Sequence, residues 1–313
     1  MSNEQKPVYG GQAVVEGVMF GGKYHYVTAI RRKDQTIDYF SCERKSKPWV
    51  QKLKKIPFVR GIVALIEASV NGTNHLNFST ERYDVDPKDD DKIEQENEPS
   101  SIVLWLGVET ISILTFLLSK VIFTLIPVFV AYVFKPIFPG EFAQIFLEGF
   151  FKLVLLLVYI YFISLTPIIK RVFQYHGAEH KVINCYENNE PLTVANVQKQ
   201  TRLHYRCGSS FIIFTVFVGV FFYMFVPLEP LYVRVLNRIA LIPVVIGVSF
   251  EVLQLTNKCR NIPVLKYLGL PGLWLQLLTT KEPSDDQVEV AIASFNRLLE
   301  MEDETKNSKL QTI

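Results

Sequence analysis

The sequence predicts a mainly α-helical, polytopic membrane protein with about four transmembrane helices and a small cytoplasmic α+β region at its N-terminus. Two observations lead to this prediction. Hydrophobic residues make up 49% of the chain, with 23 Phe among them, and they are gathered into long blocks. A bilayer requires runs of roughly 20 apolar residues, whereas a globular core needs them only at helical or strand spacing. Basic residues, in turn, are frequent in some of the segments between these blocks and scarce in others.

Composition also excludes several classes of protein. A net charge of +2, with no basic tract that alternates with aromatic residues, argues against a nucleic-acid partner. The first ten residues contain no apolar run, so no cleaved signal peptide is expected. The four cysteines do not have the close spacing of a disulfide framework.

Residues 1–48 are predicted to form a β-rich cytoplasmic unit. The runs YHYVTAI and TIDYF are rich in β-branched and aromatic residues, and Lys33-Asp34-Gln35 separates them, which predicts a hairpin. The stretch GGQAVVEGVMFGG has glycines at both ends. Such glycines suit tight turns or a close approach of the backbone to another part of the protein.

Residues 49–80 are predicted to form an amphipathic helix. Apolar residues recur in it at helical spacing, but Arg60 and Glu67 make it too charged to cross a bilayer. It is expected to lie on the membrane surface or to pack on the membrane domain. Residues 81–100 are acidic and almost free of apolar side chains, so they are interpreted as a linker.

Residues 101–280 are predicted to form the transmembrane domain. The block 101–134 would reach about 50 Å as one helix, more than the roughly 30 Å of a hydrocarbon core. It is therefore one long projecting helix, a surface turn before a span near 111–134, or a hairpin broken at Lys120. The remaining predicted spans are 150–169, 211–228 and 239–255. A further apolar segment, 262–278, is interrupted by glycines and a proline, and an interfacial or re-entrant element is expected there.

The distribution of basic residues predicts the orientation. The 170–210 loop and the tail beyond residue 257 are rich in Lys and Arg, whereas 135–144 contains one basic residue, Lys135. The positive-inside rule then places the N-terminus, the 170–210 loop and the C-terminus in the cytoplasm of a multi-pass cell-membrane protein. An even number of spans is required, which four satisfies. The segment 281–313 is expected to be a cytoplasmic helix and tail that packs back on the protein.

The 170–210 loop contains the residues that could carry chemistry. On a helix, His176, Glu179 and His180 fall within an arc of about 100°. This H-x-x-E-H pattern matches zinc-ligand spacing and the inverted zincin signature, in which the glutamate is the general base. A second pair, His204 and Cys207, follows at knuckle spacing, so zinc is the predicted cofactor.

Several alternatives remain open for these residues. The histidines could instead be solvated, or paired with Glu179 and Glu187. If four ligands held a zinc ion the site would be closed and structural, whereas a catalytic site keeps a position open. Glu251, in the fourth predicted span, is a candidate for a further carboxylate ligand, although it could equally bond within the helical bundle. Glu16, between glycines, is a weaker candidate for the site.

These motifs resemble those of the YqhQ-like family of bacterial integral membrane proteins, which are described as predicted metal-dependent enzymes. The resemblance covers nearly the whole chain and rests on GGQAVVEGVM, VRGIVALIEA, HGAEHKVINCYE, HYRCGSSF and EPSDDQVEVAIA. Two positions depart from the family pattern. Phe20-Gly21-Gly22 stands where the family has an arginine soon after EGVM, and HYRCGSSF stands where it has HPRCGTSF. Neither departure changes a predicted ligand.

Two functions follow as hypotheses. The first is a zinc-dependent membrane enzyme of the hydrolase class that acts at the cytoplasmic membrane face on a lipid-linked or membrane-protein substrate. The second is a non-enzymatic scaffold or assembly factor for other membrane proteins, with a structural zinc site. A transporter fits less well, because the predicted spans contain few charged residues and no internal repeat is visible.

Overall fold

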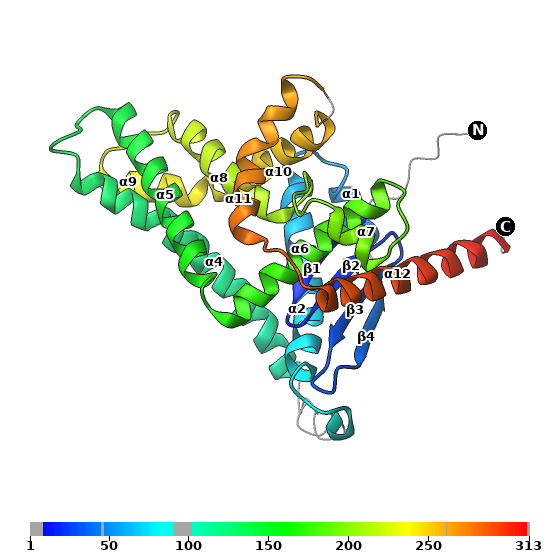
Figure 1. Cartoon of the computed structure of the whole chain (residues 1–313). Helices are drawn as coiled ribbons and strands as arrows, with labels where there is room; N and C mark the ends of the chain where they lie inside the picture. Colours follow the sequence, from blue (N-terminus) through cyan, green and yellow to red (C-terminus); the bar gives the residue numbers. More distant parts are fainter. Residues whose placement is uncertain (1–8, 45–46, 91–101, 261, 312–313) are drawn as a thin grey trace.

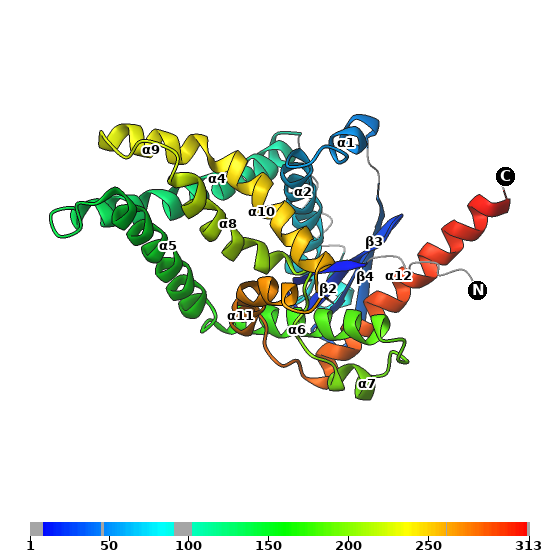
Figure 2. The same cartoon turned by 90° about the horizontal axis from the view of Figure 1, so that it is seen from above.

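The computed structural model describes residues 9–44, 47–90, 102–260 and 262–311. Within these ranges the chain is mainly helical and carries a four-stranded antiparallel sheet near its N-terminus (Figures 1 and 2). The strands, in spatial as well as sequence order, are β1 (Gly10–Val14), β2 (Gly17–Gly21), β3 (His25–Arg31) and β4 (Ile37–Glu43). The helices are α1 (Pro48–Leu53), α2 (Val59–Arg82), η1 (Pro87–Asp89), α4 (Ile102–Val133), α5 (Glu141–Ile163), α6 (Pro167–Glu187), α7 (Val194–Lys199), α8 (Gly208–Tyr223), α9 (Leu231–Ala240), α10 (Ile242–Lys258), η2 (Leu265–Gly269), α11 (Leu270–Thr279) and α12 (Asp285–Gln311).

The hairpin predicted from the sequence is confirmed as β3 and β4. Arg31 pairs with Ile37 at its closed end. The turn between them is held by Asp34, whose carboxylate accepts a hydrogen bond of 3.0 Å from the backbone N–H of Thr36. This local bond is the usual way in which an aspartate favours a turn over a continued strand.

Helices cover both faces of the sheet. On one face Phe295 of α12 packs edge to face on Phe20 of β2, with ring centroids 4.9 Å apart, and α6 contributes Ala178 and Val182 to the same core. On the other face α2 supplies His75, whose Nδ1 lies 2.6 Å from the hydroxyl of Thr28. Figure 1 shows α12 running across the sheet and beyond it. The predicted segments 1–48, 170–210 and 281–313 therefore share one core.

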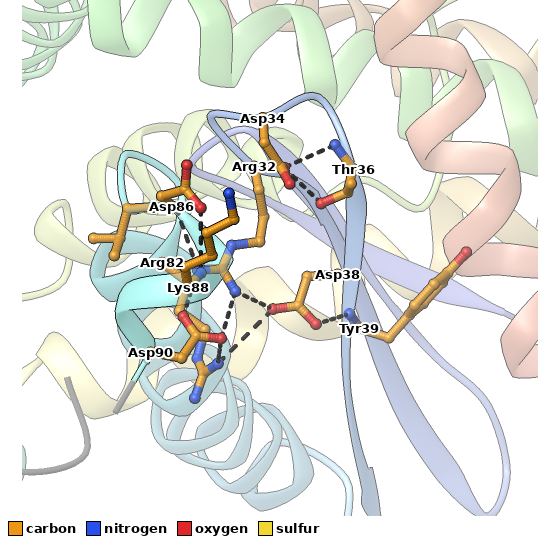
Figure 3. Close-up of polar contacts among 10 residues, drawn as sticks. Arg32, Asp34, Thr36, Asp38, Tyr39, Arg82, Asp86, Lys88 and Asp90 are labelled. Atoms are coloured by element: carbon orange, nitrogen blue, oxygen red, sulfur yellow. Dashed lines mark hydrogen bonds and ion pairs between the residues drawn. The ribbon is translucent and has the colours of Figure 1, made fainter. Parts of the chain in front are cut away.

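A cluster of ion pairs fastens the end of the α2–η1 segment to the closed end of the β3–β4 hairpin (Figure 3). The buried guanidinium of Arg32 bonds both Asp38 and Asp90. Arg82, in the last turn of α2, bonds Asp90 at 3.1 Å. Charged hydrogen bonds of this kind are about twice as strong as neutral ones. The cluster fixes the end of the α2–η1 segment against the sheet. Residues 91–100 of the predicted linker lie outside the described residues.

The predicted helix 49–80 consists of two helices. The chain bends between α1 and α2 at Phe58, which has a φ of 67°. Just after the bend, α2 packs closely on α10: a Cβ added to Gly61 would lie 2.5 Å from the Cβ of Phe250. Of the two expectations for this segment, packing on the helical domain describes the first turns of α2.

The apolar blocks form the helices that extend away from the sheet (Figures 1 and 2). Residues 102–133 make one continuous helix, α4, so no hairpin forms at Lys120. Among the described residues, Glu141–Ile163 is long and apolar enough to cross a membrane, and the α9–α10 pair, bent by 47°, would be a second such span if it counts as one. At 16 residues α8 falls short of this length, and α11, with ten, is too short to cross.

Three charged side chains are buried together at the end of this helical region. Glu148 of α5 is 1% exposed and lies between Arg234 and Arg238 of α9, which are 1% and 0% exposed. Its carboxylate oxygens lie 2.9 Å from nitrogens of both guanidiniums. Both arginines fall between the predicted spans 211–228 and 239–255, where a loop was expected, but they lie on α9 and face α5. Their ion pairs with Glu148 hold α9 against α5.

Candidate metal centre

Helix α6 places His176, Glu179 and His180 on one face. The helix begins with Pro167 after the N-cap Thr166, which suits the unpaired first turn of a helix. Its i, i+3 and i+4 side chains are neighbours, and the two imidazole centroids lie 4.5 Å apart. Glu179 and His180 are buried, and His176 is partly buried. The helix itself therefore creates the pair of adjacent imidazoles that the spacing predicted.

Cys207 completes a group of three with these histidines. It is the N-cap of α8, and its Sγ lies 3.2 Å from His176 Nε2. One ligand atom from each of His176, His180 and Cys207 falls within 4.8 Å of the other two, so the three could hold a metal ion. At zinc bond lengths of 2.0–2.3 Å, two ligand atoms of a tetrahedral site lie roughly 3.5 Å apart. The His176–Cys207 pair is already close to that spacing.

The remaining ring nitrogens are held by the backbone. His176 Nδ1 lies 2.9 Å from the carbonyl oxygen of Thr279, and His180 Nδ1 lies 2.6 Å from that of Arg202. Because a carbonyl oxygen only accepts, each Nδ1 carries a hydrogen, and Nε2 is the ring nitrogen that offers a lone pair to a metal once the ring is neutral. Metal-binding histidines are oriented in this way by a bond from their second nitrogen to a carbonyl or carboxylate.

The electrostatics of the group favour a thiolate at Cys207 and an imidazolium at His176. Burial opposes a thiolate at Cys207, but the neighbouring imidazoles outweigh it and lower the pKa of the thiol well below its usual value. Burial likewise disfavours an imidazolium at His176, while the thiolate beside it raises the pKa of His176 to about 9. The position of Cys207 at a helix N-terminus acts in the same direction on the thiol.

Glu179 is buried beside this group. Its side chain is held against β1, where it accepts a hydrogen bond from the backbone N–H of Gly11. Burial is the main reason why the pKa of Glu179 is raised. The absence of a side chain at Gly11 permits this approach, because a Cβ there would lie 2.9 Å from the Glu179 carboxyl carbon and 2.7 Å from the Met19 carbonyl oxygen.

Replacing Gly11 with alanine should therefore displace either β1 or Glu179. A Cβ cannot stay at 2.7 Å from a backbone oxygen. The free energy of unfolding of the variant should therefore fall by about 1–3 kcal/mol, the usual cost of overpacking. Gly10→Ala is the matched control, since a Cβ at Gly10 meets nothing within 4 Å. Thermal unfolding of both purified variants measures the difference. Equal unfolding midpoints would contradict this account of Gly11.

The other predicted site residues lie outside the group of three. His204 is buried near His180, with ring centroids 5.7 Å apart, but its Nε2 points to Glu187, 3.9 Å from a carboxylate oxygen. Its backbone is fixed by Gln276, which bonds both its N–H and its carbonyl oxygen. The structure thus keeps the His204 ring beside the site without bringing it among the ligand atoms.

The two predicted glutamates are also engaged elsewhere. Glu251 forms a bidentate pair with Arg60 of α2 and accepts a 3.0 Å hydrogen bond from the backbone N–H of Phe58. Glu16 is paired with Arg171. Both carboxylates connect neighbouring elements of the fold, and neither belongs to the group that could hold a metal. Of the five predicted ligands, the structure brings His176, His180 and Cys207 together, while His204 and Glu251 lie outside this group.

A cavity of about 380 Å³ opens onto the group. It is lined by the three ligand residues, Glu179, and the glycine-rich strand β1. A second cavity of about 350 Å³ adjoins it and shares Gly10, Gly11 and Arg206 among its lining residues. These volumes are in the range of small-molecule sites. The sequence analysis missed Gln276 and the two carbonyl oxygens, because a contact with the backbone leaves no signature in residue type.

Comparisons with known proteins agree with the motifs. Residues 56–301 match the family described as "Protein of unknown function (DUF1385)". The chain is 67% identical over 297 residues to the "Uncharacterized protein YqhQ" of Bacillus subtilis (strain 168), an alignment that covers 95% of this chain and 93% of that protein. No solved structure matches. The chain therefore belongs to the DUF1385 family, and the resemblance to the YqhQ-like proteins is confirmed.

Proposed function

We propose that this protein is a zinc-dependent membrane enzyme, a hydrolase whose site lies at the cytoplasmic face of the cell membrane. The observation that carries the proposal is the orientation of His176 and His180. Both donate Nδ1–H to a backbone carbonyl oxygen, which leaves Nε2 as the ring nitrogen available to a metal beside the Cys207 sulfur. Two imidazoles and one thiolate make a donor set that suits zinc, and three protein ligands are typical of catalytic rather than structural zinc sites.

The residues around the group support hydrolysis. A zinc ion bound there would act as a Lewis acid and make a coordinated water molecule more acidic. Glu179 is the nearby carboxylate that can accept the proton, because it lines the same cavity as the ligands and follows the H-x-x-E-H order. The hydrogen bond from Gly11 orients this carboxylate, and the cavity leaves room for a substrate beside it.

The surface of the helical region supports embedding in a membrane. Large apolar side chains on α4, α5 and α8 are exposed, among them Phe129, Phe146, Phe162, Phe217 and Phe221. A soluble monomer rarely exposes so many together, and lipid would cover them. With α4, α5, α8 and the α9–α10 pair as four spans, the positive-inside rule puts both termini, α6 and the metal centre in the cytoplasm.

A scaffold or assembly factor with a structural zinc site is the alternative. That function requires a closed site with four protein ligands. The His204 ring would be the fourth, and its orientation toward Glu187 favours the open site instead.

Replacing Glu179 with glutamine tests the proposal. An amide cannot accept the proton, so the variant should keep its zinc and lose its function. The measurement compares membrane lipids and membrane proteins from a deletion strain complemented with the wild type, Glu179→Gln or Glu190→Gln. Glu190 is exposed just after α6, and its variant is the matched control. If Glu179→Gln restores the wild-type profile while holding zinc, the scaffold function replaces the enzyme.

A further inference from the structure

A second kind of cavity lies inside the helical region. It has a volume of about 230 Å³, lies between α4, α5, α8 and α10, and is partly open to the outside. Its walls are mostly apolar, with Leu156, Ile160, Val216 and Val245 among the lining residues. The Thr215 hydroxyl, which also lines it, donates 2.6 Å back to the Ile212 carbonyl oxygen of its own helix. Apolar cavities of this kind stay dry and take up apolar ligands.

This interhelical cavity and the metal-centre cavity lie along the same face of α8. Ser209 lines the metal-centre cavity, whereas Ile212, Val216 and Tyr223 line the interhelical cavity. At 100° per residue these four positions fall within about 60° around the helix axis. From Ser209 to Tyr223 the face is about 20 Å long, and the two sets of lining residues are separated by a single helical turn.

Apolar side chains pack between the two cavities. Phe173 of α6, which lines the metal-centre cavity, packs into the same cluster as Ile160 and Ile212, which line the interhelical cavity. The charged residue that lines the interhelical cavity, Lys152, lies at its far end, with its amine 5.9 Å from the centre of the Tyr223 ring. Apolar side chains therefore surround most of the distance from the metal centre to the far end of the interhelical cavity.

We infer that the substrate is an amphiphile whose polar end lies at the metal centre and whose hydrocarbon chain occupies the interhelical cavity. This inference rests on the proposed function for the polar end and on the cavity for the chain. The surrounding helices expose apolar side chains on their outer surface, so a chain would enter from the lipid. Its burial is favourable by about 0.8 kcal/mol for each methylene group removed from water.

Photo-crosslinking tests the inference. The full-length protein, reconstituted in nanodiscs, is illuminated with palmitoyl lysophosphatidic acid that carries a diazirine at the methyl end of its chain. Adducts are then mapped by mass spectrometry. With the head group at the metal centre, they should fall at the far end of the interhelical cavity, on Tyr223, Ile242 and Val245. Adducts confined to the outer surface, or to Ile160 and Ile212 at the near end, would overturn it.

A matched pair of variants sharpens the test. Val245→Phe fills the interhelical cavity and should reduce labelling by at least about tenfold. Val244→Phe adds the same volume at a neighbouring side chain that is 42% exposed, and should leave labelling unchanged. Equal labelling of the two variants would refute the inference. Should Val245→Phe fail to fold, the map of wild-type adducts decides alone.

The test also separates this inference from the proposed function. A His176→Ala, His180→Ala double variant should still be labelled in the interhelical cavity, because the chain does not depend on the metal ligands. If the wild type binds zinc and the adducts lie elsewhere, the enzyme proposal stands and the chain site fails. If zinc is not bound and the adducts fall in the cavity, the chain site stands without it.

Discussion

Replacing His176 with alanine should remove zinc from the purified protein, whereas the same change at His204 should leave it bound. His176 Nε2 lies 3.2 Å from the Cys207 sulfur and is one of the three ligand atoms. With two ligands left, the site can no longer provide the minimum of three that catalytic zinc sites use. The His204 ring points to Glu187, so its loss removes no ligand.

The measurement is elemental analysis of protein purified in detergent. Wild type and His204→Ala should each carry about one zinc per chain, and His176→Ala and Cys207→Ala close to none. Circular dichroism of each variant shows whether the helices are retained, so that loss of metal is not confused with loss of fold. Zinc that disappears with His204→Ala and persists with His176→Ala would contradict the set of three ligands.

The sequence predicted the part of this site that depends on helix periodicity. His176, Glu179 and His180 needed only the 3.6-residue repeat to be placed together. Cys207 was found because its residue type is a ligand type and it lies in the same loop. The sequence could not show that Cys207 belongs to the group of three ligands and that His204 lies outside it. It depends on how Gln276 of α11 fixes the chain before α8.

The glycines of β1 allowed one tertiary contact to be anticipated from the sequence, although not its partner. The glycines of β1 indicated a close approach of the backbone to another part of the protein, and Gly11 meets the Glu179 side chain. Residue type could show that a close approach exists, but not to what. The partner lies 168 positions away in sequence, and only the packing of α6 against β1 brings the two together.

The buried ion pairs of the helical region were not predicted from the sequence. A predicted second span of 150–169 excluded Glu148, whereas α5 begins at Glu141 and includes it. Hydropathy placed the start of the span after this residue, because a lone glutamate lowers the average of any window that contains it. The partners of Glu148 are Arg234 and Arg238, which fall between the predicted spans 211–228 and 239–255. A buried ion pair between two segments cannot be recognised from either segment alone.

Replacing Glu148 with glutamine should destabilise the protein by about 3–5 kcal/mol, the usual cost of removing one partner from a buried ion pair. Both guanidiniums would stay buried without a counter-charge, since Arg234 and Arg238 are each at most 1% exposed. The stacking of Arg238 on Tyr223, 3.9 Å from the ring centre, offsets only a small part of this loss. Thermal unfolding in detergent, followed by tryptophan fluorescence, measures the effect.

Further variants separate the effect of the unpaired buried charges from a simple loss of packing. A triple variant, Glu148→Leu with Arg234→Met and Arg238→Met, removes all three charges and keeps apolar volume, so it should recover most of the stability. Glu141→Gln, an exposed change in the first turn of the same helix, should cost no more than about 1 kcal/mol. If the triple variant is less stable than Glu148→Gln, the cluster contributes more than charge balance. If Glu148→Gln unfolds like the wild type, α9 does not depend on Glu148 for its place on α5.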